Sequence, residues 1–551
     1  MVETKVDMKF LRIFLPLLLL AAACNVVPES YSWEHFEMDG HRTGVSVPAA
    51  DNVAEALGTV SGKIYTAPNG RVFRGGSTPK VAEELIAVQP DMAYLKEVVA
   101  FCPEGLKKYS PESPLSNFIV DHLKSATERI TGRHVDLAIA NFGGIRCDLP
   151  EGNVLLDDVV SMLPFANYAT WLSVPGSELR KVFEQMAGLP LCISGAQMEV
   201  ADGKLVSVKI GGKPIDERKY YGLATIDFLM DGGDGYKLAR GAKDFVITDQ
   251  RIGDIILADI RAITAAGEPL QYSTDGRVKF TKAEPAPAAK EEAPVTEAAP
   301  VPAGKPKLVI MHCNDTHSHF DPFPTDKGYR GGIIERAAFA DSIRSVYPAG
   351  KVLMLHAGDF NQGSSYYSEL GGSLEPKMIN ALHYDCITLG NHELDNGIED
   401  LAARLSRINC PVVCANCEFP DTLQKYVKPY TIIKRGGMRI GIIGMESDIA
   451  TMVAAPIAQR IQQYDNAETI LKWAPYLKEE QDCDMVILLS HLGYGADQDI
   501  ITRVRGVDLV IGGHTHTFVK DFVYAEDLDG HRVPVITDGC WGREMGLIKV
   551  Y

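Results

Sequence analysis

The feature that most constrains the fold is a series of short apolar runs in the second half of the chain, residues 307–551. Stretches with helical spacing, such as Ile334–Val346 and Leu374–Leu382, separate some of these runs. Alternating buried strands and helices predict a layered α/β domain. The runs are Leu308–Met311, Val352–Leu355, Cys386–Leu389, Ile440–Ile443, Met485–Leu489 and Leu509–Ile511.

Five of these six runs are followed at once by polar residues that are able to bind metal ions. In open α/β sheets, sites form beyond the carboxyl ends of the strands, so these side chains are expected to converge. Carboxylate, imidazole and amide groups suit borderline cations such as Zn²⁺ or Mn²⁺. The five blocks are Asn314–His317, Gly358–Gly363, Gly390–Asp395, Ser490–His491 and Gly512–His516.

The blocks predict a centre for two metal ions. A single Asp-x-His is weak evidence, because a lone loop histidine is usually solvated, but five blocks in order favour a common site. Asp315 and His317 can point the same way from a strand end, as can His514 and His516. One carboxylate must bridge ions roughly 3.5–4 Å apart, and Asp359 is the natural candidate.

A linker rich in proline and alanine divides the chain. Residues 283–306 contain eight Ala, six Pro and four Glu, and no aromatic residue. Such a segment cannot bury enough apolar surface to fold. In polyproline form it would reach roughly 70 Å, so it permits docking of the two halves without requiring it.

The first half, residues 31–282, mixes strands and helices without a steady βαβ rhythm, which indicates an α+β domain. Phe165 and Phe228 lie in loop-like segments and could stack on a base, or could be core residues. Arg146 could contact phosphate or ribose, and Asp234 could accept ribose hydroxyls. These residues alone leave the choice open.

The N-terminus, residues 1–24, has the layout of a secretory signal: basic residues, an apolar run from Ile13 to Ala23, then small residues. The sequence ending at Cys24 resembles a bacterial lipobox, which predicts lipidation of Cys24; a plain Ala-x-Ala cleavage site is the alternative. The net charge of −17 argues against a nucleic-acid polymer as partner.

The second half resembles the calcineurin-like metallophosphoesterases, specifically their 5′-nucleotidase branch, over all five blocks. The resemblance implies a four-layer α/β/β/α sandwich that binds two divalent ions, Zn, Mn or similar. The resemblance also implies that His392 assists phosphoryl transfer and that Asp395 orients the His392 ring. The implied ligands are Asp315, His317, Asp359 and His516 for the first ion, and Asp359, Asn391, His491 and His514 for the second.

The first half resembles the substrate-binding domain of 5′-nucleotidases. The resemblance implies that a base stacks between two phenylalanines and that three polar residues contact the nucleotide. Phe142 stands where the family usually has glycine, and the order of the two domains is reversed relative to the family. The implied residues are Phe165, Phe228, Asn141, Arg146 and Asp234.

The combined prediction is a metallophosphoesterase sandwich preceded by an α+β nucleotide-recognition domain. Its expected activity is hydrolysis of nucleoside 5′-monophosphates, or related nucleotides, by a metal-activated water. The alternatives are a nucleotide-sugar or nucleoside-diphosphate hydrolase, a 2′,3′-cyclic phosphodiesterase, and a nucleotide-binding surface lipoprotein without turnover. We expect an exported bacterial protein, periplasmic or at the cell surface, held to the membrane only by a lipid. The halves would dock in cis or between chains.

Overall fold

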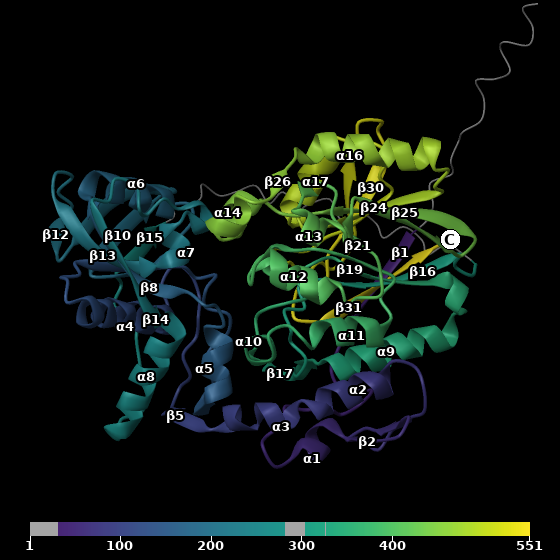
Figure 1. Ribbon diagram of the computed structural model, residues 1–551, viewed down its shortest axis with the longest axis horizontal. Coiled ribbons are helices and arrows are strands. Elements are labelled where there is room, and N and C mark those ends of the chain that lie inside the picture. The colour runs from purple at the N-terminus through teal and green to yellow at the C-terminus, as the bar shows by residue number, and fades with distance from the viewer. Residues whose placement is uncertain (1–30, 282–303, 326) are drawn as a thin grey trace, which may run out of the picture.

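The computed structural model describes residues 31–281, 304–325 and 327–551. They form two lobes, with the first half of the chain supplying most of the left lobe of Figure 1. The predicted signal segment with Cys24, and nearly all of the predicted linker, lie outside the described residues. None of the helices in the described part of the chain has the length and apolar character that a membrane crossing requires.

The right-hand lobe contains two sheets. The first has seven strands, antiparallel at one edge and parallel from β16 onward. In spatial order they are β1 (Tyr31–Glu37), β31 (Glu544–Val550), β16 (Leu308–Cys313), β19 (Val352–His356), β20 (Cys386–Thr388), β21 (Val412–Val413) and β23 (Val427–Lys428).

The second sheet has six strands. Its central part, from β25 through β27 and β28 to β30, is parallel, and each edge strand pairs antiparallel with its neighbour. In spatial order the strands are β24 (Tyr430–Arg435), β25 (Met438–Met445), β27 (Met485–Ser490), β28 (Leu509–Ile511), β30 (Arg532–Ile536) and β29 (Val523–Glu526).

The two sheets pack face to face, because alternate residues along each strand point to opposite faces. On β16, Leu308 and Ile310 join Ile487 and Leu489 of β27 in one buried cluster between the sheets. Val309 of β16 points the other way, toward the helices that cover the first sheet.

Helices cover the outer face of each sheet. α9 (Ile333–Val346) and α11 (Glu375–Leu382) lie outside the first sheet, and α16 (Asn466–Pro475) and α17 (Tyr494–Ile501) lie outside the second. Figure 1 shows these layers on the right. The predicted four-layer α/β/β/α sandwich is therefore confirmed.

The left-hand lobe is α+β, as predicted. Its five-stranded sheet packs against α4 (Pro114–Thr131) and α8 (Ile252–Ala265), and a second sheet of four strands lies beside it. The five strands are, in spatial order, β14 (Asp244–Arg251), β8 (Tyr168–Pro175), β13 (Tyr220–Ile226), β6 (Leu137–Ala140) and β9 (Cys192–Ser194). The four are β12 (Lys213–Pro214), β11 (Lys204–Ile210), β10 (Ala196–Ala201) and β15 (Val278–Thr281).

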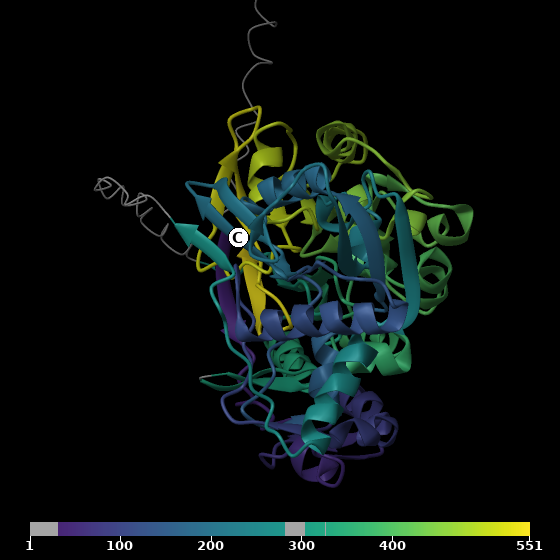
Figure 2. The ribbon, with the colours of Figure 1, turned by 90° about the vertical axis from the view of Figure 1, so that its left-hand side faces the viewer.

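The predicted boundary at residue 31 is not where the fold divides the chain. Residues 31–96, hereafter the arm, pack on the right-hand lobe: β1 pairs with β31 along all seven of its residues. α2 (Thr78–Ala87) lies against α9 and α11, and its N-terminus is capped by Asp341 of α9. Figures 1 and 2 show the helical part of the arm, including α2, below the sandwich, whereas β1 lies within it. Residues 97–281 are therefore an insertion between the arm and the rest of the right-hand lobe. After the sequence predictions, residues 97–281 are hereafter the recognition lobe, and the right-hand lobe is the metal lobe.

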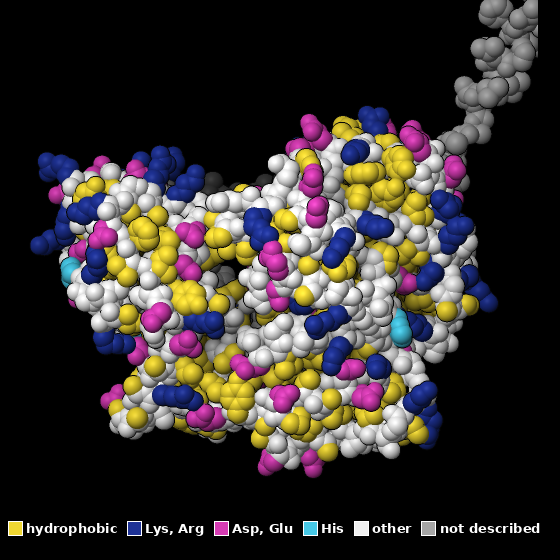
Figure 3. All heavy atoms as spheres, viewed as in Figure 1, with side chains coloured by type: hydrophobic (Ala, Val, Ile, Leu, Met, Phe, Trp, Pro, Cys, Tyr) yellow, Lys and Arg dark blue, Asp and Glu magenta, His cyan; other side chains and the backbone are white. Residues whose placement is uncertain are grey.

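The lobes touch at several points. α5 (Leu156–Met162) of the recognition lobe packs against α10 (Ser365–Leu370), where the backbone N–H of Ser365 donates to Ser161 Oγ at 3.1 Å. A second contact joins the turn Gly233–Gly235 to α14 (Ile449–Met452). Figure 3 shows the surface hollowed between the lobes.

Candidate active site

All seven predicted metal ligands lie in loops beyond the carboxyl ends of parallel strands. Asp315 and His317 follow β16, Asp359 follows β19, and Asn391 follows β20. The remaining three, His491, His514 and His516, follow β27 and β28 of the second sheet. The loops of both sheets thus meet at one end of the sandwich.

The ligand loops adopt a backbone conformation that most residues avoid. Five of the seven predicted ligands have positive φ: Asp315, His317, Asp359, His514 and His516. For residues other than glycine, the left-handed region costs roughly 1–2 kcal/mol each. Such strain is stored at functional sites, where the surroundings hold side chains in an arrangement that relaxed loops would not give.

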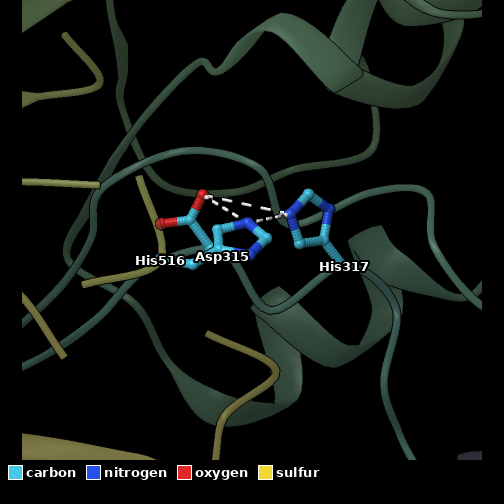
Figure 4. Close-up of side chains that lie close together, drawn as sticks. All are labelled: Asp315, His317 and His516. Carbon is cyan, nitrogen blue, oxygen red and sulfur yellow. Dashed lines mark hydrogen bonds and ion pairs between the residues drawn. The ribbon is translucent and has the colours of Figure 1, made fainter. Parts of the chain in front are cut away.

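One group of potential ligands comprises Asp315, His317 and His516 (Figure 4). His516 Nε2 lies 3.5 Å from Asp315 Oδ1 and 2.9 Å from His317 Nε2. Asp315 and His317 are fully buried. The three side chains converge on one point and are three of the four ligands predicted for the first ion.

A second group comprises Asp359, His491 and His514. His491 Nε2 lies 3.1 Å from Asp359 Oδ2, and the same oxygen lies 3.7 Å from His317 Nε2 of the first group. Asp359 therefore stands between the groups, where a bridging ligand would be. Asn391 Oδ1 is buried without a hydrogen-bond partner in the described structure. A buried unpaired amide oxygen is costly and points to a missing ligand.

The rings of two ligands are oriented by backbone carbonyls. His491 Nδ1 lies 2.7 Å from the Ala357 carbonyl, and His317 Nδ1 lies 2.8 Å from the Gln362 carbonyl. Donation from Nδ1 leaves Nε2 free as the ligand atom. Burial lowers the pKa of His317, and burial also lowers that of His514 to about 4. Neutral imidazoles, as favoured at His317 and His514, fit divalent ions such as Zn²⁺ or Mn²⁺ together with carboxylate and amide oxygens.

His392 and Asp395 form the predicted pair beside these groups. His392 Nδ1 lies 2.8 Å from Asp395 Oδ2, which leaves Nε2 as the free ring nitrogen. Burial alone would lower the pKa of His392, but Asp395 and Asp359 outweigh it, so the net shift is upward. A protonated imidazole is therefore favoured where negative charge would develop.

A cavity of about 720 Å³ opens between the lobes and has residues of both in its walls. Asp359, His392 and His516 contribute to one wall. All five predicted substrate residues contribute to the other: Asn141, Arg146, Phe165, Phe228 and Asp234.

Two of the predicted substrate residues reach the metal-ligand side. Arg146 lies 3.1 Å from His317 Nε2, and the Phe165 ring centroid lies 5.6 Å from that of His392. Asn141 and Asp234, which also line the cavity, pair with each other at 2.8 Å. The predicted catalytic and recognition residues are thus brought to one cavity.

Sequence reasoning missed several residues of this region. Tyr367 and Met452 line the cavity, but neither lies in a motif, so no local signal marks them. Phe142 packs against the core and does not line the cavity. Lys108 donates to the Ile145 carbonyl at 2.6 Å, which supports the Arg146 loop.

Two other clusters of potential ligands in the described residues are already engaged by protein groups. Glu335, near Asp39 and His41, accepts hydrogen bonds from Arg42 and Thr43. In the cluster of Asp527, Asp529 and His531, Asp529 lies 3.1 Å from Arg505. Neither matches the convergence at the strand ends.

Comparisons with known proteins match two regions of the chain to known families. Residues 97–240 match the family model for the 5′-nucleotidase C-terminal domain, and residues 308–518 match the model for calcineurin-like phosphoesterase. A snake venom 5′-nucleotidase of Gloydius brevicauda is 32% identical over 275 residues, which is 45% of this chain and 46% of that protein. The 5′-nucleotidase of Bos taurus is 31% identical over 276 residues, 45% of this chain and 47% of that protein.

Among solved structures, that of a 5′-nucleotidase precursor from Thermus thermophilus is 28% identical with a TM-score of 0.40, covering 44% of this chain and 52% of that one. The chain spans about half the length of the curated relatives that it matches. It carries, in this order, a region that matches the 5′-nucleotidase C-terminal domain family and a region that matches the calcineurin-like phosphoesterase family.

Proposed function

We propose that this chain is a two-metal phosphohydrolase that releases phosphate from nucleoside 5′-monophosphates. The observation that carries the proposal is the shared cavity: metal-ligand groups and His392 line one wall, and two aromatic rings with Arg146 line the other. The match to phosphoesterase and 5′-nucleotidase families supports the reaction class.

Recognition would use the wall contributed by residues 97–281. Phe165 and Phe228 offer apolar ring faces to a base, with stacking worth about 1–3 kcal/mol per base. Asp234, held by Asn141, accepts hydrogen bonds from ribose hydroxyls. Arg146 carries its guanidinium to the metal-ligand groups, where it pairs with a phosphoryl oxygen.

Hydrolysis would take place where the two ligand groups meet. Two divalent ions, when bound, lower the pKa of a water and neutralise charge on the phosphoryl group. Asp315, His317, Asp359 and His516 would hold one ion, and Asp359, Asn391, His491 and His514 the other.

His392 would act on the reacting group directly. Its protonated ring, oriented by Asp395 through Nδ1, presents Nε2–H to the charge that develops on the phosphoryl or leaving-group oxygen. The upward pKa shift favours the protonated form of this ring. Phe165 packs beside the ring and reduces its contact with water.

A hydrolase acting on nucleoside diphosphates or nucleotide sugars is the second candidate. The cavity of about 720 Å³ has room for a second phosphate or a sugar beside a mononucleotide. The same two ligand groups would serve either substrate class. Export, and lipidation at Cys24, stay predictions from the sequence.

The test compares phosphate release from AMP, UDP-glucose and bis-p-nitrophenyl phosphate, with Mn²⁺ and with EDTA. We expect AMP turnover that EDTA abolishes. Phe228→Ala should raise KM for AMP roughly 10-fold, the equivalent of about 1.4 kcal/mol of stacking, while turnover of a second monoester, p-nitrophenyl phosphate, stays unchanged. Turnover only of the diester, or an equal loss with both monoesters, would contradict the proposed substrate.

A further inference from the structure

Glu393 is a buried acid within the candidate site that the proposed chemistry does not use. It follows His392 in the Gly390–Asp395 block, and it is fully buried. Lone buried carboxylates are costly unless hydrogen bonds satisfy them. Its partners therefore reveal what it does.

The Glu393 carboxylate binds the backbone of two ligand loops at once. Oε2 accepts from the N–H of Asp359 at 2.8 Å and from that of Gly390 at 2.6 Å. Oε1 accepts from the N–H of Asn361 at 3.0 Å. One side chain thus joins the loop after β19 to the loop after β20.

The contact is reciprocal. Asp359 Oδ1 accepts from the backbone N–H of His392 at 3.0 Å, so the carboxylate of each loop binds the backbone of the other. This leaves Asp359 Oδ2 facing the Nε2 atoms of His491 and His317. The orientation of the predicted bridging carboxylate therefore depends on the spacing of the two loops.

We propose that Glu393 is a positioning residue that sets the distance between Asp359 and Asn391, and thereby the affinity of the second metal ion. Both of those predicted ligands lie on the loops that Glu393 joins, whereas Asp315, His317 and His516 lie on other loops. The inference rests on the proposed two-metal centre.

Glu393→Gln tests the proposal with little change in shape. Both oxygens of Glu393 accept backbone N–H groups, and the amide nitrogen of glutamine cannot, so one N–H loses its acceptor. Loss of such an orienting contact weakens metal binding about 10–100-fold. We expect this loss at the second ion and a smaller one at the first.

The matched control is Glu335→Gln. Glu335 is likewise fully buried and accepts three hydrogen bonds, from the backbone and guanidinium of Arg42 and from Thr43 Oγ1. It joins the arm to α9 and touches none of the ligand loops. Its replacement should lower thermal stability without changing metal affinity.

The measurement is titration of the metal-free full chain with Mn²⁺, followed by electron paramagnetic resonance. Wild type should bind two ions and give the signal of an exchange-coupled pair. In Glu393→Gln that signal should need 10–100-fold more Mn²⁺, with an unchanged circular dichroism spectrum. Wild-type affinities in this variant, or equal weakening in Glu335→Gln, would overturn the proposal. A wild-type chain that binds no pair would instead overturn the proposed function.

Discussion

Asp321 carries a titratable group whose burial should make stability depend on pH. Its Oδ2 accepts a hydrogen bond from Tyr366 Oη at 2.8 Å, and its Oδ1 is buried without a partner in the described structure. Burial raises the pKa of this carboxyl to about 7, although Lys96 and Tyr366 oppose the shift. The folded protein therefore holds a proton that the unfolded chain, with a pKa near 3.9, releases.

The sign follows from this difference. A raised pKa means that the folded state binds more protons, so the free energy of unfolding falls as pH rises from about 4 to 7. Asp321→Asn removes that loss and should raise the free energy of unfolding at pH 8. The residue is partly exposed, which limits the gain to roughly 1–3 kcal/mol. The gain should shrink toward pH 4.

Thermal unfolding at pH 5 and pH 8 checks this expectation. We expect Tm of Asp321→Asn to exceed that of wild type by a few degrees at pH 8 and by less at pH 5. The exposed Asp499→Asn serves as the control and should change Tm at neither pH. A Tm gain that is equal at both pH values would show that Asp321 does not titrate as described.

At the residue scale, the metal ligands could be predicted from the sequence, but the residues that position the ligand loops could not. Asp315, Asp359 and His491 stand directly after apolar strands, which is a local pattern. Glu393 has no such pattern, because its role lies in backbone contacts to residues 32 and 34 positions away. Contacts of that kind depend on how the loops fold.

At the element scale, the contribution of β1 to stability can be tested by deleting this strand. Its Phe36 packs on Phe339 of α9 at 5.0 Å between ring centroids, and its Trp33 lies 6.1 Å from Phe522. Full burial of a large ring contributes about 1.5–3 kcal/mol, and these two half-buried rings contribute part of that each. A chain that begins at residue 40 should lose several kcal/mol and roughly 10 °C in Tm. A chain that begins at residue 31 is the control, and equal Tm values would contradict a structural role for β1.

The placement of β1 shows why this part of the fold could not be predicted. Tyr31 pairs with Val550, near the far end of the chain. Periodicity indicates that a segment forms a strand, but it does not say which distant strand it joins. The segment 31–96 therefore reads from sequence as part of the first half, although its partners belong to the second.

At the scale of the whole molecule, the arm changes what the predicted linker has to do. The recognition lobe follows directly from the arm at residue 97, and the arm is held on the metal lobe by contacts along its length. Asp341 caps α2 through the N–H groups of Ser77 and Thr78, and Gln89 Nε2 donates to Tyr366 Oη at 2.9 Å. The lobe is thus attached at its N-terminal side independently of residues 283–303.

Cleavage within residues 283–303 removes the linker attachment and leaves the attachment through the arm, so it tests which of the two holds the recognition lobe. A protease site placed there should yield two fragments that elute together on size exclusion, because the seven-residue pairing of β1 with β31 and the arm contacts still join them. We expect kcat/KM for AMP to stay within about twofold of the uncut protein, since an arm-held lobe keeps its effective concentration. Separation of the fragments, or loss of AMP turnover with p-nitrophenyl phosphate turnover retained, would show that the linker delivers the recognition lobe to the metals.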